Sequence, residues 1–156
     1  MADVYRDPSA STTDRVADLL SRMTLEEKAA QLGAAWVTEL VRDGDEPTVD
    51  ESKAAAVLRH GIGQITRIGS STGLWPDESA RLFNSIQEFA LRSTRLGIPI
   101  VLHEEAVAGF THRGATVFPQ ALGLASSWDP ELVESLFRRQ STVCTAESEY
   151  SRGWAE

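Results

Sequence analysis

The segment that most constrains the fold of this chain is a short apolar run that ends in charged residues. The run from Ile98 to Leu102 has the length and β-branching expected of a buried strand. It breaks at once into His103, Glu104 and Glu105. In α/β proteins, ligand chemistry is placed at the carboxyl ends of buried parallel strands. We therefore expect these three residues to lie in a functional site rather than in an ordinary turn.

A strand, a helix and a second strand follow one another around this segment, and this order predicts an α/β fold. Residues 63–68 alternate between apolar and polar side chains, as a half-buried strand does. Pro76 suits the first turn of the helix that follows. The apolar face of that helix consists of Leu82, Phe83, Ile86, Phe89 and Ala90. Residues 98–102 form the second strand of the unit.

Further helices are predicted on both sides of this unit. One has an apolar face made of Val16, Leu19, Leu20 and Met23. A second starts at Thr24, whose spacing from Glu27 fits a capping box, and stops near Gly33. A third, short helix ends at His60. A last helix opens at Asp129, with an inward face of Leu132, Val133, Leu136 and Phe137. Residues 39–51 and 69–73 are predicted to be loops, and the first dozen residues an extended lead-in.

The acidic balance of the chain excludes two classes of partner. The sequence has 23 Asp and Glu residues against 15 Lys and Arg residues, a formal net charge of −8. Such a surface attracts neither nucleic acid nor an anionic membrane. The apolar runs are far shorter than the ~20 residues of a membrane span, and the first residues lack the apolar region of a secretory signal. Cys144 is the only cysteine, so no intrachain disulfide is possible and a cytoplasmic location is predicted.

Common cofactor and metal motifs are missing or incomplete. Gly61 and Gly63 precede a strand instead of following one, and the third glycine of a dinucleotide fingerprint is absent. The segment from Gly69 to Gly73 lacks the lysine of a phosphate-binding loop. No Gly-x-Ser-x-Gly nucleophile elbow is present. Adjacent residues in 103–105 point in different directions, so they do not form a chelating set by themselves. We expect no cofactor and no metal.

On residue chemistry alone, the acid pair fits several roles. Glu104 and Glu105 could be ligands of a sugar or a cation, general acids or bases, or a solvated strand end. Carboxylates suit sugars because each accepts charge-assisted hydrogen bonds from neighbouring hydroxyls. A nearby tryptophan strengthens that interpretation, since an indole stacks on the apolar face of a pyranose. Trp36, Trp75 and Trp128 are available, although packing in the core or in a loop explains each of them too.

Four segments of the chain occur in an order that is known from one protein family. They are Arg95-Leu-Gly-Ile-Pro99, His103-Glu-Glu-Ala-Val-Ala-Gly109, Gly114-Ala-Thr-Val-Phe-Pro-Gln120 and Trp128-Asp-Pro-Glu-Leu-Val133. They resemble the N-terminal region of glycoside hydrolase family 3, and residues 14–28 resemble the lead-in helices of its β-glucosidases and β-xylosidases. The resemblance implies the N-terminal portion of a (β/α)8 TIM-like barrel in residues 1–139. That portion is incomplete, with about two barrel strands plus helices, and residues 140–156 form a divergent tail of uncertain status.

The resemblance also implies a role for the opening segment. Family members are retaining glycosidases, and Glu105 matches the position of an acidic residue that binds sugar hydroxyls, with His103 and Glu104 beside it. Ala108 stands where many members have His, a departure shared by xylosidase-like members that also read His-Glu-Glu. Retaining hydrolysis needs two carboxyl groups about 5 Å apart, one as nucleophile and one as acid/base. The resemblance implies that both lie further along the chain, so no catalytic residue is predicted here.

The sequence is therefore interpreted as a fragment of a β-glycosidase that hydrolyses terminal β-linked glucose or xylose. A β-linked saccharide is the expected substrate of the parent enzyme. The isolated chain is expected to be inactive and, because its strand edges are unpaired, to self-associate. The alternative is a non-catalytic sugar-binding or interaction module that is built from the first units of the barrel.

Overall fold

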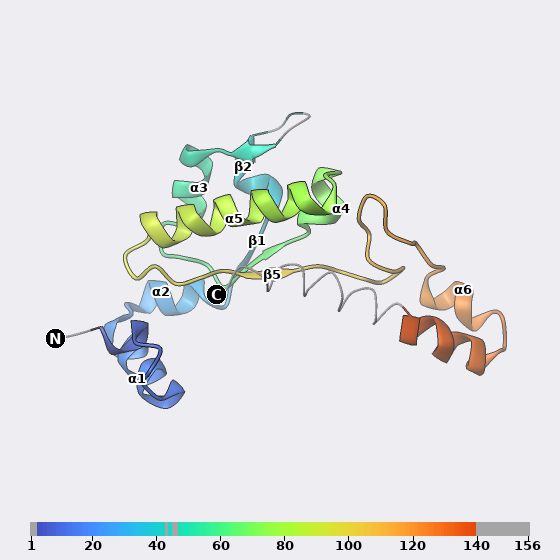
Figure 1. Ribbon diagram of the computed structural model, residues 1–156, viewed down its shortest axis with the longest axis horizontal. Helices are drawn as coiled ribbons and strands as arrows, with labels where there is room; N and C mark the ends of the chain where they lie inside the picture. The colour runs from blue at the N-terminus through green and yellow to red at the C-terminus, as the bar shows by residue number, and fades with distance from the viewer. Residues whose placement is uncertain (1–2, 43, 45–46, 140–156) are drawn as a thin grey trace.

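The structure is a computed structural model that describes residues 3–42, 44 and 47–139, and its centre is a parallel sheet (Figure 1). The sheet has three strands in the order β1–β4–β5. Their bounds are β1 Ala34–Trp36, β4 Gln64–Thr66 and β5 Val101–His103. The register places Ile65 opposite Ala35 on one side and opposite Leu102 on the other. The carboxyl ends of all three strands therefore lie at one edge of the sheet.

Helices and a small hairpin surround this sheet. The chain begins with η1 (Val4–Arg6), α1 (Thr12–Arg22) and α2 (Leu25–Ala30). Between β1 and β4 it forms η2 (Val37–Glu39), β2 (Val41–Arg42), β3 (Thr48–Val49) and α3 (Glu51–Val57), with β2 and β3 antiparallel. The remaining helices are α4 (Ile68–Thr72), α5 (Pro76–Ser93), α6 (Ala121–Ala125) and a helix at residues 130–139. The β4–α5–β5 order agrees with the predicted α/β class.

Helix α5 covers one face of the sheet because its apolar residues recur with helical spacing. Its buried positions are Leu82, Ile86, Phe89 and Ala90, which share one core cluster with Ala35 and Ile65. Glu78 caps its first turn by accepting a hydrogen bond from the backbone N–H of Trp75 at 2.7 Å. The side-chain amide of Gln87 also bonds both backbone groups of Ile100, at 2.6 and 2.9 Å, and so ties the approach to β5 to this helix.

The two faces of the sheet differ, as the strand period of two requires. One face carries the buried row Ala35, Ile65 and the partly buried Leu102. The opposite face carries Trp36 and His103, both exposed, on either side of Thr66 in the register. Parallel sheets are normally covered on both faces. This sheet is therefore covered on one face and open on the other within the described residues.

The structure corrects the predicted number of strands. Two strands were expected, at 63–68 and 98–102, and both occur, the second displaced to Val101–His103. The third, β1, was missed, because Ala34-Ala35-Trp36 is too short to show a periodicity and two of its residues are alanines with low strand preference. It forms a strand because its backbone pairs with β4, whose own register is set by the buried Ile65.

Other expected elements also differ from the structure. Residues 69–73 were expected to be a loop, yet most of them belong to α4. The expected loop at 39–51 contains β2, β3 and the fully buried Leu40. The expected extended lead-in contains η1. The helix at 130–139 was expected to turn Leu132 and Phe137 inward, but both are exposed, because this helix and α6 extend away from the sheet (Figure 1).

The predicted capping box at Thr24 is confirmed and has a further partner. The Thr24 hydroxyl accepts from the Glu27 backbone N–H at 3.2 Å, and the Glu27 carboxylate accepts from the Thr24 backbone N–H at 2.8 Å. Glu27 is buried, with 7% of its surface exposed, and its two oxygens also accept from Arg95 at 2.9 and 2.5 Å. Hydrogen bonding to Arg95 lowers the pKa of Glu27. This ion pair joins the lead-in helices to the segment before β5.

Candidate functional site

The candidate site lies where the three parallel strands end. Trp36 is the last residue of β1, Arg67 follows β4 directly, and Glu104 and Glu105 follow β5 directly. Because parallel neighbours end at the same edge of a sheet, these residues gather although up to 69 positions separate them in the sequence. The sequence predicted the acids at this edge. It did not identify Arg67, whose only sequence signal is its place near the end of the strand predicted at residues 63–68.

Arg67 has an unusual backbone conformation. Its φ of 63° and ψ of 43° lie in the left-handed region, which residues with a bulky side chain rarely adopt. Its N–H donates to the carbonyl oxygen of His103 at 2.9 Å, which continues the β4–β5 pairing by one residue. The chain then turns into α4, for which Arg67 is the N-cap residue. The left-handed conformation therefore ends the strand sharply and begins the helix at the site.

The Arg67 side chain joins β1 and β5. Its guanidinium forms an ion pair with the carboxylate of Glu105 and lies over the ring of Trp36, 4.6 Å from the ring centroid. Hydrogen bonding to Arg67 is the main cause that lowers the pKa of Glu105, and the same bond raises the pKa of Arg67. Glu105 is thus held in its charged form. Both side chains stay accessible, with 47% of Glu105 and 30% of Arg67 exposed.

Glu104 has a different environment from its neighbour. Its Oε1 accepts a hydrogen bond from the backbone N–H of Gly69 at 2.7 Å, so it caps the first turn of α4. The carboxylate is about half-buried, and this burial raises the pKa of Glu104, while the Gly69 hydrogen bond opposes the shift. One oxygen of Glu104 is therefore engaged in holding α4. Its predicted role as a sugar ligand stays a prediction.

His103 connects the two acids to the sheet. It is the last residue of β5 and its side chain is exposed on the open face. Its carbonyl oxygen holds the backbone of Arg67. The charge of its ring acts to lower the pKa of both Glu104 and Glu105, though it is a minor cause in each. The three predicted site residues are therefore close together, and their sugar-binding role stays a prediction.

The loop after β5 packs closely against α4. The His112 ring lies within 3.1 Å of the Ser79 hydroxyl and stacks on Phe110, with 5.3 Å between ring centroids. A Cβ atom added at Gly69 would lie 2.2 Å from Cδ2 of His112, so only glycine fits there. The residue that donates to Glu104 is therefore also packed closely against the His112 ring.

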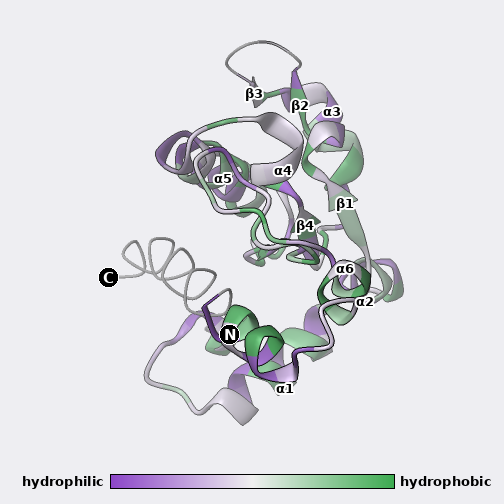
Figure 2. Ribbon diagram, turned by 90° about the vertical axis from the view of Figure 1, so that its right-hand side faces the viewer, coloured by the Kyte–Doolittle hydropathy of each residue, from purple (hydrophilic) through white to green (hydrophobic). Residues whose placement is uncertain are grey.

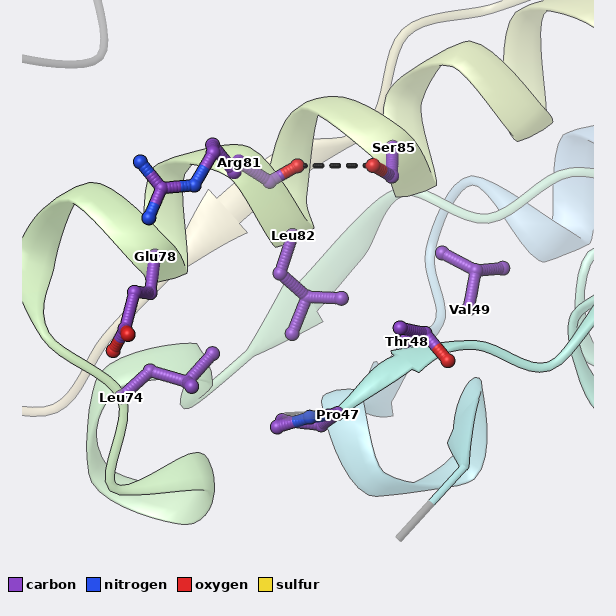
Figure 3. Close-up of a pocket in the computed structure, with 8 residues that line it drawn as sticks. All are labelled: Pro47, Thr48, Val49, Leu74, Glu78, Arg81, Leu82 and Ser85. Atoms are coloured by element: carbon purple, nitrogen blue, oxygen red, sulfur yellow. Dashed lines mark hydrogen bonds between the residues drawn. The ribbon is translucent and has the colours of Figure 1, made fainter. Parts of the chain in front are cut away.

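Grooves also occur away from this site. One, of about 470 Å³, lies between β3 and the first half of α5 (Figure 3). It is lined by Pro47, Thr48, Val49, Leu74, Glu78, Arg81, Leu82 and Ser85. None of the strand-end residues lines it, and its carboxylate, Glu78, already caps α5. A second groove, of about 460 Å³, lies beside Trp128, whose side chain is 91% exposed.

Among the residues described, no group of three or more His, Cys, Asp or Glu side chains is placed to hold a metal ion. No helix within residues 3–42, 44 and 47–139 is long and apolar enough to cross a membrane.

The chain matches one family and several enzymes. Residues 24–146 match the family "Glycosyl hydrolase family 3 N terminal domain". A relative named "Probable beta-glucosidase C" from Aspergillus flavus is 35% identical in an alignment that covers 85% of this chain and 22% of that protein. A "Periplasmic beta-glucosidase/beta-xylosidase" from Dickeya chrysanthemi is 31% identical over 83% of this chain and 21% of that protein.

A solved structure is similar as well. It is a β-glucosidase from Erythrobacter marinus, 32% identical, with a TM-score of 0.61 over 87% of this chain and 17% of that chain. The chain thus spans about a fifth of the length of the proteins that it matches.

Figure 2 shows hydrophobic residues along α6. Leu122 of α6 is 86% exposed.

Proposed function

Because the chain belongs to glycosyl hydrolase family 3, through its N-terminal domain, we propose that its strand ends form one wall of a sugar subsite in a retaining β-glycosidase. The three parallel strands then correspond to the first strands of a (β/α)8 barrel, within residues 1–139. In such a barrel, sites lie at the carboxyl ends of the strands. The open sheet face becomes the barrel interior, which explains why one face lacks a cover.

The observation that carries the proposal is the pair of environments at Glu104 and Glu105. Glu105 is charged, half-exposed and held by Arg67, as a carboxylate that accepts hydrogen bonds from sugar hydroxyls needs to be. Glu104 instead holds α4. Trp36 adds an exposed indole at the same edge, suited to the apolar face of a pyranose. The substrate class proposed from the relatives is a terminal β-linked glucose or xylose.

The bond-breaking groups are not proposed among the described residues. A retaining enzyme needs a nucleophile and an acid/base on opposite sides of the glycosidic bond, about 5 Å apart. Glu104 and Glu105 are sequence neighbours, one bonded to α4 and the other paired with Arg67, so we do not propose them as the two groups that act on opposite sides of the bond. We therefore expect the isolated chain to bind sugar without hydrolysing it. The cytoplasmic location of the chain stays a prediction. The divergent tail, residues 140–156, lies outside the described residues.

The test is a titration of the purified chain with methyl β-D-xylopyranoside and methyl β-D-glucopyranoside, followed by NMR. Binding should weaken by roughly tenfold in Glu105→Ala, because a charge-assisted acceptor is lost. Glu131→Ala, an exposed acid on the helix at 130–139, is the matched control and should bind as the original chain does. Equal binding by Glu105→Ala and the control would refute the assignment of the subsite. Turnover of a nitrophenyl β-xyloside by the chain alone would refute the inactivity.

A further inference from the structure

We propose that Arg67 determines the specificity of this subsite, by presenting with Glu105 a fixed donor–acceptor pair to two neighbouring hydroxyls of a pyranose. The inference rests on the proposed function, since it concerns the same sugar. Neither the sequence motifs nor the predicted ligands include Arg67. The inference is based on three contacts of Arg67: to His103, to Glu105 and to Trp36.

The Arg67 backbone is held from both sides. Its N–H is bonded to the carbonyl oxygen of His103 at 2.9 Å, and the next turn is held by the Glu104–Gly69 hydrogen bond at 2.7 Å. The left-handed backbone directs the side chain away from the course that the strand would give it. The backbone from which the arginine side chain extends is therefore already fixed in the folded chain, which lowers the entropy that ordering this residue costs on binding.

The Arg67 guanidinium has two close neighbours, the Trp36 ring and the Glu105 carboxylate. Trp36 covers one of its faces, with 4.6 Å to the ring centroid, and Glu105 occupies part of its edge. A guanidinium has five N–H donors in a fixed fork, so donors remain for a ligand after Glu105 is paired. Of the Arg67 side chain, 30% stays exposed at the strand ends, where a ligand can approach it.

The pair can therefore recognise two hydroxyls at once. Glu105 accepts a hydrogen bond from one sugar O–H, and the Arg67 fork donates to the oxygen of the neighbouring hydroxyl. A sugar that lacks one of the two hydroxyls leaves a desolvated partner unpaired, which is the basis of strong discrimination. Lysine cannot replace arginine here, because its ammonium is a point charge without a planar fork and stacks less well on Trp36.

A purely structural Arg67 would behave differently. If it only held Glu105 and Trp36 in place, its loss would weaken binding of all sugars by the same factor. If it donates to one hydroxyl, its loss has little further effect on the sugar analogue that already lacks that hydroxyl. The comparison of variants and analogues therefore separates contact with the sugar from support of the fold.

The experiment titrates the full chain with methyl β-D-xylopyranoside and with its analogues that each lack one ring hydroxyl. The variants are Arg67→Met, Arg67→Lys and Glu105→Ala, with Arg22→Met as control. Arg22 also pairs with a carboxylate, Asp18 at 2.9 Å, and lies over an aromatic ring, that of Tyr5, but in the lead-in helix α1. Two-dimensional NMR spectra of each variant check that it is folded.

We expect Arg67→Met and Arg67→Lys to weaken binding of the complete sugar by roughly tenfold, with Arg22→Met unchanged. For one deoxy analogue, the original chain and Arg67→Met should bind equally weakly. If Arg67→Met binds like the original chain, or weakens binding of all sugars equally, while Glu105→Ala weakens binding as predicted above, the role of Arg67 is refuted and the subsite stands. If Glu105→Ala also has no effect, or the original chain binds none of the sugars, the proposed function itself is refuted.

Discussion

The division of roles between Glu104 and Glu105 predicts that their substitutions affect different properties. In Glu104→Ala, the backbone N–H of Gly69 loses its acceptor. Gly69 is buried, so water does not readily replace the carboxylate there. A buried donor left unpaired costs about 1–3 kcal/mol. The free energy of unfolding should fall by that amount, a large change for a chain of this size. Glu104→Gln keeps an acceptor oxygen and should lose less than ~1 kcal/mol.

The assay is urea denaturation of each variant followed by circular dichroism. Glu131→Ala gives the effect of removing an exposed acid and should change stability little. The reasoning is refuted if Glu104→Ala is as stable as Glu131→Ala, or if Glu104→Gln is as unstable as Glu104→Ala. Glu105→Ala should leave the stability near that of the original chain while weakening sugar binding, because its carboxylate caps no helix.

The ionisation of Glu104 predicts in which direction the free energy of unfolding changes with pH. Burial raises the pKa of Glu104 in the folded chain above the ordinary value of 4.5. The folded state then binds its proton more tightly than the unfolded state does. The resulting stability is fully present below pH 4.5 and is lost as the pH rises through the raised pKa. Glu104→Gln should remove this part of the stability profile. An unchanged profile above pH 4.5 would contradict the assignment.

Three further predictions concern the fold. Gly63→Ala places a Cβ atom 2.0 Å from the backbone oxygen of Gln31. Urea denaturation should therefore show a free energy of unfolding that is lower by about 3 kcal/mol or more. Gly44→Ala, with open space around it, should leave the free energy of unfolding unchanged. Arg95→Met leaves the buried Glu27 without its ion-pair partner and should lower the midpoint of thermal unfolding; an unchanged midpoint would show that this pair contributes nothing. Because one sheet face is open, sedimentation should show association at high concentration, and a strict monomer would contradict this.

Much of the site's location could be predicted from the sequence. An apolar run that stops at charged residues marks the end of a buried strand, and this placed His103, Glu104 and Glu105 at the correct edge. Helix α5 was also predictable, because its proline and its apolar spacing agree. These signals are local, so they can be read from neighbouring residues alone.

The elements that were missed depend on distant residues. The α4 sequence Ile-Gly-Ser-Ser-Thr has a loop-like composition, and the cap that holds its first turn comes from Glu104, which lies 35 residues away from Gly69. The left-handed Arg67 gives no sequence signal either, since glycine or asparagine is the usual residue in that conformation. Trp36 was named as one of three possible tryptophans, but its place beside Arg67 depends on β1, a strand that exists through pairing with β4.

The most direct test of the central claim is a crystal structure of the chain soaked with methyl β-D-xylopyranoside. We predict that the sugar lies at the strand ends, with one hydroxyl donating to Glu105, a neighbouring oxygen accepting from Arg67, and Glu104 still bonded to the Gly69 N–H. A sugar bound instead in the groove between β3 and α5, with Glu105 and Arg67 making no contact with it, would contradict the account.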